Sequence, residues 1–211
     1  MESKGTVFDG FLSGKVYDRL ASLFGFGPAL YRRAADLAPV APGQVILDIG
    51  CGTGAFCSAV ANRIGAECEI HGVDLSQKQL DEAREKMESK GVGFVPHPCS
   101  MDELPFPPAT FDTVITSLAI HSATPPVRRA AITETARVLK DGGNFVLVDW
   151  TRPRGFFGRV LWFPFSPALR GDDSRDNWDN RYVSLCEGEN LKLKDSEFVS
   201  PFVLYQCFEK E

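Results

Sequence analysis

The chain has 211 residues, 44% of them hydrophobic, and this apolar content is sufficient for one full core, so a single domain is expected. The formal net charge of −5 argues against a nucleic-acid partner, because phosphate contacts need clustered Lys and Arg. No apolar stretch is long enough for a transmembrane helix, and no secretory signal is visible. The six cysteines form no C-x-x-C pair, so we expect no metal site and a reducing, cytoplasmic location.

The N-terminal segment, residues 1–41, is predicted to be helical. Residues 16–24 and 29–37 each have the composition of a short helix, and a Gly- and Pro-containing break separates them. A helical segment that precedes the first strand can fold over a ligand crevice. We therefore expect residues 1–41 to form a lid.

The stretch V-I-L-D-I-G-C-G-T-G predicts a buried strand, a glycine turn and the start of a helix. Such a unit makes a crevice at the carboxyl end of a parallel strand. Gly50, Gly52 and Gly54 are needed because a Cβ atom would block the tight turn or the close approach of a ligand. Cys51, between the first two glycines, is interpreted as a small filler of the loop and not as a nucleophile.

Two carboxylates indicate which ligand the loop holds. Asp48 comes just before the glycines, and Asp74 follows the second predicted strand, residues 69–73. A carboxylate at that strand end can accept both hydroxyls of a ribose. The G-x-G-x-G spacing differs from the G-x-G-x-x-G of dinucleotide enzymes, and an anionic Asp48 suits an ammonium or sulfonium group better than a pyrophosphate. These features favour S-adenosylmethionine over NAD.

The rest of the chain alternates between helices and strands. Ser76 and Gln79 have the spacing of a capping box, and Gly91 ends the helix that follows. Helices are predicted at residues 76–89, 126–139 and 178–186, and strands at 93–97, 111–117, 144–149, 191–199 and 202–208, with a turn at 140–143.

The ends of two predicted strands contribute further candidates. Ser117, Leu118 and His121 follow the fourth strand and are expected to face the cofactor or the acceptor. Asp149 ends the fifth strand, close to where an acceptor would lie. His121, whose residue type titrates near neutral pH, is a candidate general base, and an orienting hydrogen-bond donor is the alternative. His121 and Asp149 are the candidate catalytic residues.

Residues 151–190 are interpreted as an acceptor-side insertion. Aromatic side chains are frequent at residues 156–165. This segment can be a lid that makes an apolar, aromatic acceptor pocket, a connector packed on the sheet, or a surface helix in peripheral contact with a membrane. The sequence leaves the three interpretations open.

Four motifs together carry a family resemblance. The glycine stretch, then G-V-D-L-S, L-P-F-P-P-A-T-F-D-T-V and R-V-L-K-D-G-G, resemble the class I S-adenosylmethionine-dependent methyltransferases across residues 42–149. The resemblance implies an α/β fold, a Rossmann-like doubly wound seven-stranded sheet that is mostly parallel, with one antiparallel strand in a C-terminal hairpin at residues 191–211. Residues 42–150 would be the cofactor-binding core.

The resemblance also implies a set of cofactor-binding residues. The loop after the third strand closes on adenine in that family, where Ser100 replaces the usual Asp and Met101 follows it. Asp102 is a possible substitute, but we interpret it as a solvent-exposed loop acid. The full set is Tyr17, Asp48, Gly50, Cys51, Gly52, Gly54, Asp74, Leu75, Ser100, Met101, Ser117, Leu118 and His121.

The N-terminal pattern F-D…Y-D-R-L…F-G-F-G…Y-R-R is similar to the ubiquinone/menaquinone-biosynthesis C-methyltransferases. In that resemblance Tyr17 approaches the methionine end of the cofactor, whereas the alternative is a core aromatic. The stretch S-L-A-I-H-S departs from the F-G-x-R-N of those enzymes, which weakens the quinone assignment.

The sequence therefore predicts methyl transfer from S-adenosylmethionine, with S-adenosylhomocysteine as product, to a small apolar or aromatic acceptor by direct displacement. One alternative is a quinone or lipid methyltransferase that acts at a membrane surface. An alternative of another class is a non-catalytic module that binds the cofactor. Oligomeric state is not indicated by any feature of the sequence.

Overall fold

The computed structural model describes residues 27–152 and 181–211 of the chain. Tyr17, the helix predicted at residues 16–24 and the aromatic segment at residues 156–165 lie outside these residues, as do most of the predicted lid (1–41), most of the predicted insertion (151–190) and the start of the helix predicted at 178–186.

A mixed sheet forms the centre of the molecule, with strand order β3-β2-β1-β4-β5-β7-β6. Strand β7 runs antiparallel to both of its neighbours, and the other pairings are parallel. This confirms the predicted doubly wound, seven-stranded fold with one antiparallel strand in the C-terminal hairpin. The strands are β1 (Val45–Ile49), β2 (Glu69–Asp74), β3 (Gly93–Pro98), β4 (Phe111–Ser117), β5 (Leu139–Trp150), β6 (Leu191–Ser200) and β7 (Val203–Lys210).

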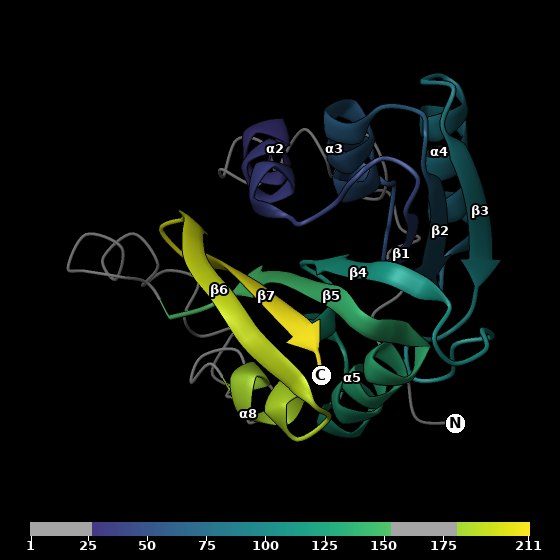
Figure 1. The fold of residues 1–211 in the computed structure, drawn as a ribbon. Helices are drawn as coiled ribbons and strands as arrows, with labels where there is room; N and C mark the ends of the chain where they lie inside the picture. Colours follow the sequence, from purple (N-terminus) through teal and green to yellow (C-terminus); the bar gives the residue numbers. More distant parts are fainter. Residues whose placement is uncertain (1–26, 153–180) are drawn as a thin grey trace.

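Helices cover both faces of the sheet (Figure 1). Helices α2, α3 and α4 lie over one face, and α5 and α8 lie over the other. Their bounds are α2 (Pro28–Leu37), α3 (Ala55–Ile64), α4 (Gln77–Glu88), α5 (Pro125–Val138) and α8 (Tyr182–Glu187), and a single 3₁₀ turn, η1 (Ile120–Ser122), precedes α5. None of the helices within 27–152 and 181–211 is long and apolar enough to cross a membrane.

Strand β1 is buried on both faces because it lies between two apolar layers. Ile46 belongs to the core under α2 and α3, whereas Leu47 and Ile49 belong to the core on the side of α5. Successive side chains of a strand point to opposite faces, so a strand covered on both sides needs a nearly continuous apolar run. The one ionisable exception in this run, Asp48, is fully buried.

Strand β5 begins earlier than predicted. Leu139 already pairs with Phe111, and the next regular pair is Asn144 with Thr113, so four residues of β5 separate these pairs where β4 has only one. Gly142 has a φ of 74°, a conformation that glycine adopts without strain. The predicted turn is therefore a bulge within β5 and not a connection before it.

The two edge strands differ in how they end the sheet. Edge strand β3 contains Pro96 and Pro98, which have no N–H group to donate. Edge strand β6 carries Lys192 and Lys194, which form exposed ion pairs with Glu211 and Glu209 at 2.8 and 3.0 Å.

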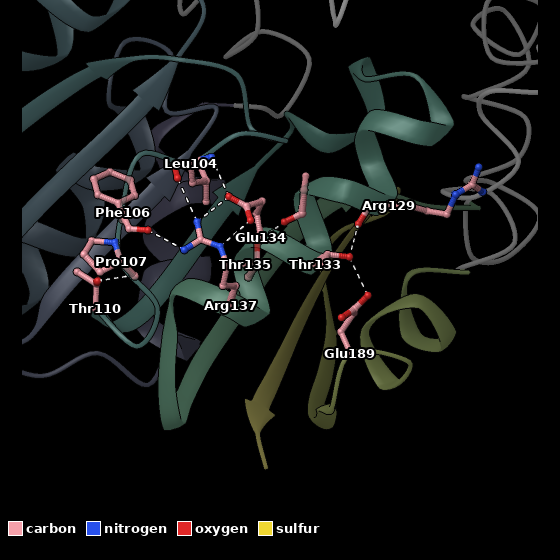
Figure 2. Close-up of polar contacts among 11 residues, drawn as sticks. Leu104, Phe106, Pro107, Thr110, Arg129, Thr133, Glu134, Thr135, Arg137 and Glu189 are labelled. Atoms are coloured by element: carbon pink, nitrogen blue, oxygen red, sulfur yellow. Dashed lines mark hydrogen bonds and ion pairs between the residues drawn. The ribbon is translucent and has the colours of Figure 1, made fainter.

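An ion pair on α5 holds the loop between β3 and β4 (Figure 2). Arg137 contacts both carboxylate oxygens of Glu134 at 2.6 and 2.7 Å and donates to the carbonyls of Phe106 (2.7 Å) and Leu104 (3.0 Å). Glu134 in turn accepts the N–H of Leu104 at 2.9 Å. The hydrogen bond from Arg137, together with that of the Leu104 N–H, keeps the pKa of Glu134 below its usual 4.5.

We predict that Glu134→Gln destabilises the fold in a pH-dependent way. A lowered carboxylate pKa gives stability that is present above about 4.5 and is lost as the pH falls through the lower folded value. The free energy of unfolding in urea should drop by about 1–3 kcal/mol at neutral pH, and the difference from wild type should shrink below pH 4.5. Glu88→Gln, which removes an exposed ion pair of 3.9 Å on α4, is the matched control and should change little. An equal loss from both variants would contradict the prediction.

Candidate functional site

The glycine loop after β1 is tied to the end of β2. The N–H groups of Gly50 and Cys51 both donate to the carbonyl of Val73, at 2.8 and 3.0 Å. Gly50 has a φ of 68°, and a Cβ atom on it would lie 2.4 Å from the Cβ of Ala119. Only glycine therefore allows the loop to approach the segment that follows β4, which carries Leu118 and His121.

Asp74, at the end of β2, joins the loop to α4. Its Oδ2 accepts the N–H of Gly52 at 3.0 Å, and its Oδ1 accepts the N–H of Ser76 at 2.9 Å. The hydroxyl of Ser76 accepts the N–H of Gln79 at 3.3 Å and caps α4, as the sequence predicted. A carboxylate at the end of a parallel strand, beside a glycine loop, can accept the hydroxyls of a ribose.

Asp48 is a fully buried carboxylate beneath the loop. Its Oδ2 accepts the thiol of Cys57 at 2.9 Å, whereas its Oδ1 has no hydrogen-bond partner in the described part of the chain. Burial raises the pKa of Asp48 to about 7, and the nearby charge of Asp74 acts in the same direction. A buried oxygen without a partner is costly, and a cation or a donor beside it would offset that cost.

Cys51 lies inside the loop with its side chain buried. Burial and the charges of Asp48 and Asp74 raise the pKa of its thiol well above the usual 9.0, so the thiol is neutral and unreactive. A Cβ atom on Gly72 of β2 would lie 2.8 Å from the sulfur, which shows how tightly it is enclosed. These properties agree with the filler role expected from the sequence.

The rim beside Asp74 is partly apolar. Leu75 is 41% exposed, which is unusual for a large apolar side chain, and half-buried Met101 packs against the core on the α5 side. Ser100 donates its hydroxyl to the carboxylate of Asp102. Asp102 is half-buried, so its interpretation as a solvent-exposed loop acid was wrong. The carboxylate of Asp102 is thus hydrogen-bonded to Ser100 within the loop that the sequence predicted to contact adenine.

His121 and Asp149 form a dyad. The backbone N–H of His121 donates to Oδ2 of Asp149 at 3.1 Å, and its Nδ1 lies 2.8 Å from Oδ1. Nδ1 can donate to this carboxylate, and in the neutral imidazole that does so Nε2 keeps a lone pair. The side chain of His121 is 29% exposed and that of Asp149 only 3%. A partly exposed imidazole is thus hydrogen-bonded to a buried carboxylate.

The segment that leads to His121 is strained. Leu118 has a φ of 50°, in the left-handed region that non-glycine residues rarely adopt, and its N–H donates to Val148 at 2.8 Å. Such conformations cost free energy and occur preferentially at functional sites. Ser117, the last residue of β4, is half-buried at the same edge.

Two aromatic rings stand beside the dyad. Trp150 meets the ring of His121 edge to face at a centroid distance of 6.2 Å and stacks on Phe202 at 5.8 Å. Phe202 was missed from the sequence because it is remote in the chain. The predicted hairpin was the one available signal. Its second strand runs antiparallel to β5, so the turn before that strand lies at the carboxyl end of β5.

Arg128 was also missed. The alternation of polar and apolar residues in α5 gave no reason to bury an arginine, yet this side chain is fully buried.

The candidates after β1 and β2 are connected by backbone hydrogen bonds, and those after β4 and β5 by the dyad. The contact of Gly50 with Ala119 joins the two groups.

We predict that Asp48→Asn changes the pH dependence of stability. A carboxylate with a folded pKa near 7, raised from 3.8, stabilises the fold most at low pH and loses that contribution as the pH rises towards 7. Between pH 5 and pH 8, urea unfolding should show Asp48→Asn gaining roughly 2–3 kcal/mol relative to wild type. Asp81→Asn, on the exposed face of α4, should follow wild type at all pH values. A pH-independent difference for Asp48→Asn would refute the assignment.

Comparisons with known proteins agree with this geometry. A family model described as a methyltransferase domain matches residues 46–143. The demethylmenaquinone methyltransferase of Bacillus licheniformis is 34% identical over 151 residues, which are 71% of this chain and 64% of that protein. The chain thus spans just under two thirds of the length of that relative.

A second relative is matched over more of its length. The ubiquinone/menaquinone biosynthesis C-methyltransferase UbiE of Cupriavidus metallidurans is 30% identical over 185 residues, 86% of this chain and 71% of that protein. A solved SAM-dependent methyltransferase from Aquifex aeolicus shares the fold with a TM-score of 0.69 at 16% identity, over 93% of this chain and 96% of that one. The chain belongs to the class I S-adenosylmethionine-dependent methyltransferases, the family that includes these ubiquinone/menaquinone-type enzymes.

Proposed function

We propose that the protein transfers a methyl group from S-adenosylmethionine to a small aromatic acceptor that carries a ring hydroxyl. The observation that carries the proposal is the pair of carboxylates around the glycine loop. Asp48 keeps a buried oxygen without a partner among the described residues, and Asp74 places its carboxylate beside the loop, where it accepts the N–H of Gly52. A ligand that is both cationic and a ribonucleoside satisfies both.

The same residues disfavour an anionic nucleotide. A pyrophosphate beside the loop would lie near the carboxylates of Asp48 and Asp74. Burial, and after it the charges of these two carboxylates, raise the pKa of the Cys51 thiol. Like charges that lie close together repel each other, and the repulsion is strong where water is excluded. A positively charged ligand has the opposite effect and favours the ionised form of Asp48.

The adenine end of the cofactor would lie at the rim. Leu75 offers an exposed apolar surface on which a flat base can rest, and Met101 lies in the loop on the same side. In this proposal the pair of Ser100 and Asp102 takes the place of the single Asp that is usual in the family, because the carboxylate of Asp102 accepts from Ser100 and can accept from an exocyclic amine.

The acceptor would lie between the dyad and the aromatic pair. Trp150 and Phe202 provide an apolar wall next to His121, and a planar ring packs well against stacked aromatic side chains. An acceptor oxygen or activated ring carbon in that place must lose a proton, and Nε2 of His121 is positioned to take it. The names of the relatives point to quinol-type acceptors, which belong to this class.

S-adenosylmethionine, when bound, supplies a methyl group on a positively charged sulfur that leaves as a neutral thioether. The chain needs no nucleophile of its own and contributes alignment and exclusion of water. Asp48 and Asp74 would hold the cofactor, and His121 would take the proton of the acceptor. The buried anion of Asp149 stabilises the imidazolium that results.

The cofactor assignment predicts the outcome of calorimetric titration. S-adenosylmethionine and S-adenosylhomocysteine should both bind wild type, and Asp74→Ala should raise both Kd values at least about tenfold because two charge-assisted hydrogen bonds are lost. Asp81→Ala, an exposed carboxylate on α4, should bind as wild type does. Failure of wild type to bind either compound would remove the proposed function.

The base assignment predicts the effect of His121→Gln. Glutamine keeps hydrogen-bonding capacity but takes no proton, so kcat with a prenylated naphthoquinol or a simple phenol should fall about 100- to 10,000-fold, with the Kd of the cofactor unchanged. His71→Gln, in the middle of β2, serves as the control and should keep its kcat. If His121→Gln retains activity and His121→Ala loses it, the residue orients its ligand and is not a base.

A further inference from the structure

Arg128, on α5, is a charged side chain that belongs neither to the two carboxylates around the glycine loop nor to the dyad. Its side chain is fully buried, although a guanidinium is among the costliest groups to remove from water. Nε and Nη2 donate to the carbonyl of Ala123 at 3.2 and 2.8 Å, and Nη2 also lies 3.4 Å from the carbonyl of His121. The charge is thus directed at the backbone that carries the proposed base.

The turn that receives these hydrogen bonds has little stability of its own. The 3₁₀ turn η1 is three residues long and contains His121 itself, and Ala123 is the residue at its C-terminal end. A single 3₁₀ turn has few internal hydrogen bonds, and the left-handed Leu118 just before it adds strain. Contacts from neighbouring elements must therefore fix its position.

Three neighbours provide such contacts. Gly50 of the loop abuts Ala119 before the turn, and Asp149 of β5 accepts both the N–H and Nδ1 of His121. Arg128 donates to the carbonyls of His121 and of Ala123, which is at the C-terminal end of the turn. Asp149 thus binds the N–H and the ring of His121, whereas Arg128 binds carbonyls of the same turn. Together these hydrogen bonds define the position of the imidazole ring.

We propose that Arg128 is a positioning residue for methyl transfer: by holding the carbonyls of His121 and Ala123 it fixes η1 and keeps the imidazole of His121 in register with Asp149. The inference rests on the proposed role of His121 as the group that takes the acceptor proton. Arg128 itself touches neither cofactor nor acceptor in this proposal. A displacement of the ring by about 1 Å is enough to lower kcat roughly 100-fold.

The planar fork of arginine is essential to this role. Its nitrogens reach two carbonyls at once in a fixed geometry, whereas a lysine ammonium is a single point on a flexible stem. Arg128→Lys therefore keeps the buried charge but cannot hold both carbonyls rigidly. Arg128→Met removes charge and donors while keeping an unbranched apolar stem.

The first readout needs no acceptor. In proton NMR of the full chain bound to S-adenosylhomocysteine, the Nδ1–H of His121 should give a downfield signal, assigned by its disappearance in His121→Gln. We expect this signal to broaden or vanish in Arg128→Lys and Arg128→Met. The chain has three histidines, and signals of His71 and His97, which hydrogen-bond to each other at 3.0 Å, should remain in place as an internal reference.

The second readout is kinetic, with the prenylated naphthoquinol as acceptor. Arg128→Lys should lower kcat roughly 10- to 100-fold while KM and the Kd of S-adenosylmethionine change less than about threefold. Val138→Ala, a fully buried position at the far end of α5, controls for loss of stability and should keep its kcat.

The outcomes separate the two proposals. If Arg128→Lys leaves both the imidazole signal and kcat unchanged, the positioning role is wrong. If the signal is lost in Arg128→Lys but His121→Gln is fully active, Arg128 holds the turn and the base assignment is wrong. Equal losses of kcat in Arg128→Lys and Val138→Ala would show a general effect of stability and overturn the inference.

Discussion

The site depends on one topological constraint, the reversal of strand order at β1. Because β2 lies on one side of β1 and β4 on the other, the chain segments that leave these strands diverge and leave a crevice at the carboxyl edge. The glycine loop lies at this edge, where Gly50 contacts Ala119 in the segment that follows β4. The candidate residues in the described ranges lie near the carboxyl ends of β1 to β5 or in the segments that follow these strands.

Charges are buried at this edge at a cost to the fold. Asp48 in β1, Asp149 near the end of β5 and Arg128 at the start of α5 are all buried. A folded protein tolerates such groups when they are hydrogen-bonded or when a ligand completes their environment. Asp149 is hydrogen-bonded to His121, and Arg128 to carbonyls at the η1 turn, whereas Asp48 keeps one oxygen that the described residues do not satisfy.

The sequence was most informative where the determinants are local. The strand, glycine turn and helix of the first motif, the cap at Ser76 and the ends of β4 were predicted from short patterns, and the structure agrees with them. The start of β5 was misjudged because Asp141 and Gly142 look like a turn, and only the pairing of Leu139 with Phe111 extends the strand beyond it.

The parts that could not be predicted depend on contacts between distant segments. Burial of Arg128 follows from the position of η1 over the start of α5, which no pattern within α5 encodes. Phe202 stacks on Trp150, the neighbour of His121, because β7 returns beside β5. The ion pair of Glu134 with Arg137 looks like an ordinary surface pair in the sequence, and its role depends on the loop carbonyls that it contacts.

The two edges of the sheet determine how this molecule can associate with others. Free N–H and C=O groups at a sheet edge invite another strand to add to it, and this is a common route to aggregation. On β3 the prolines at positions 96 and 98 interrupt the row of donors, and on β6 lysines and their acidic partners surround the edge with charge. A second copy of the chain would meet an incomplete ladder at one edge and a charged strand at the other, so self-association by strand addition is disfavoured at both.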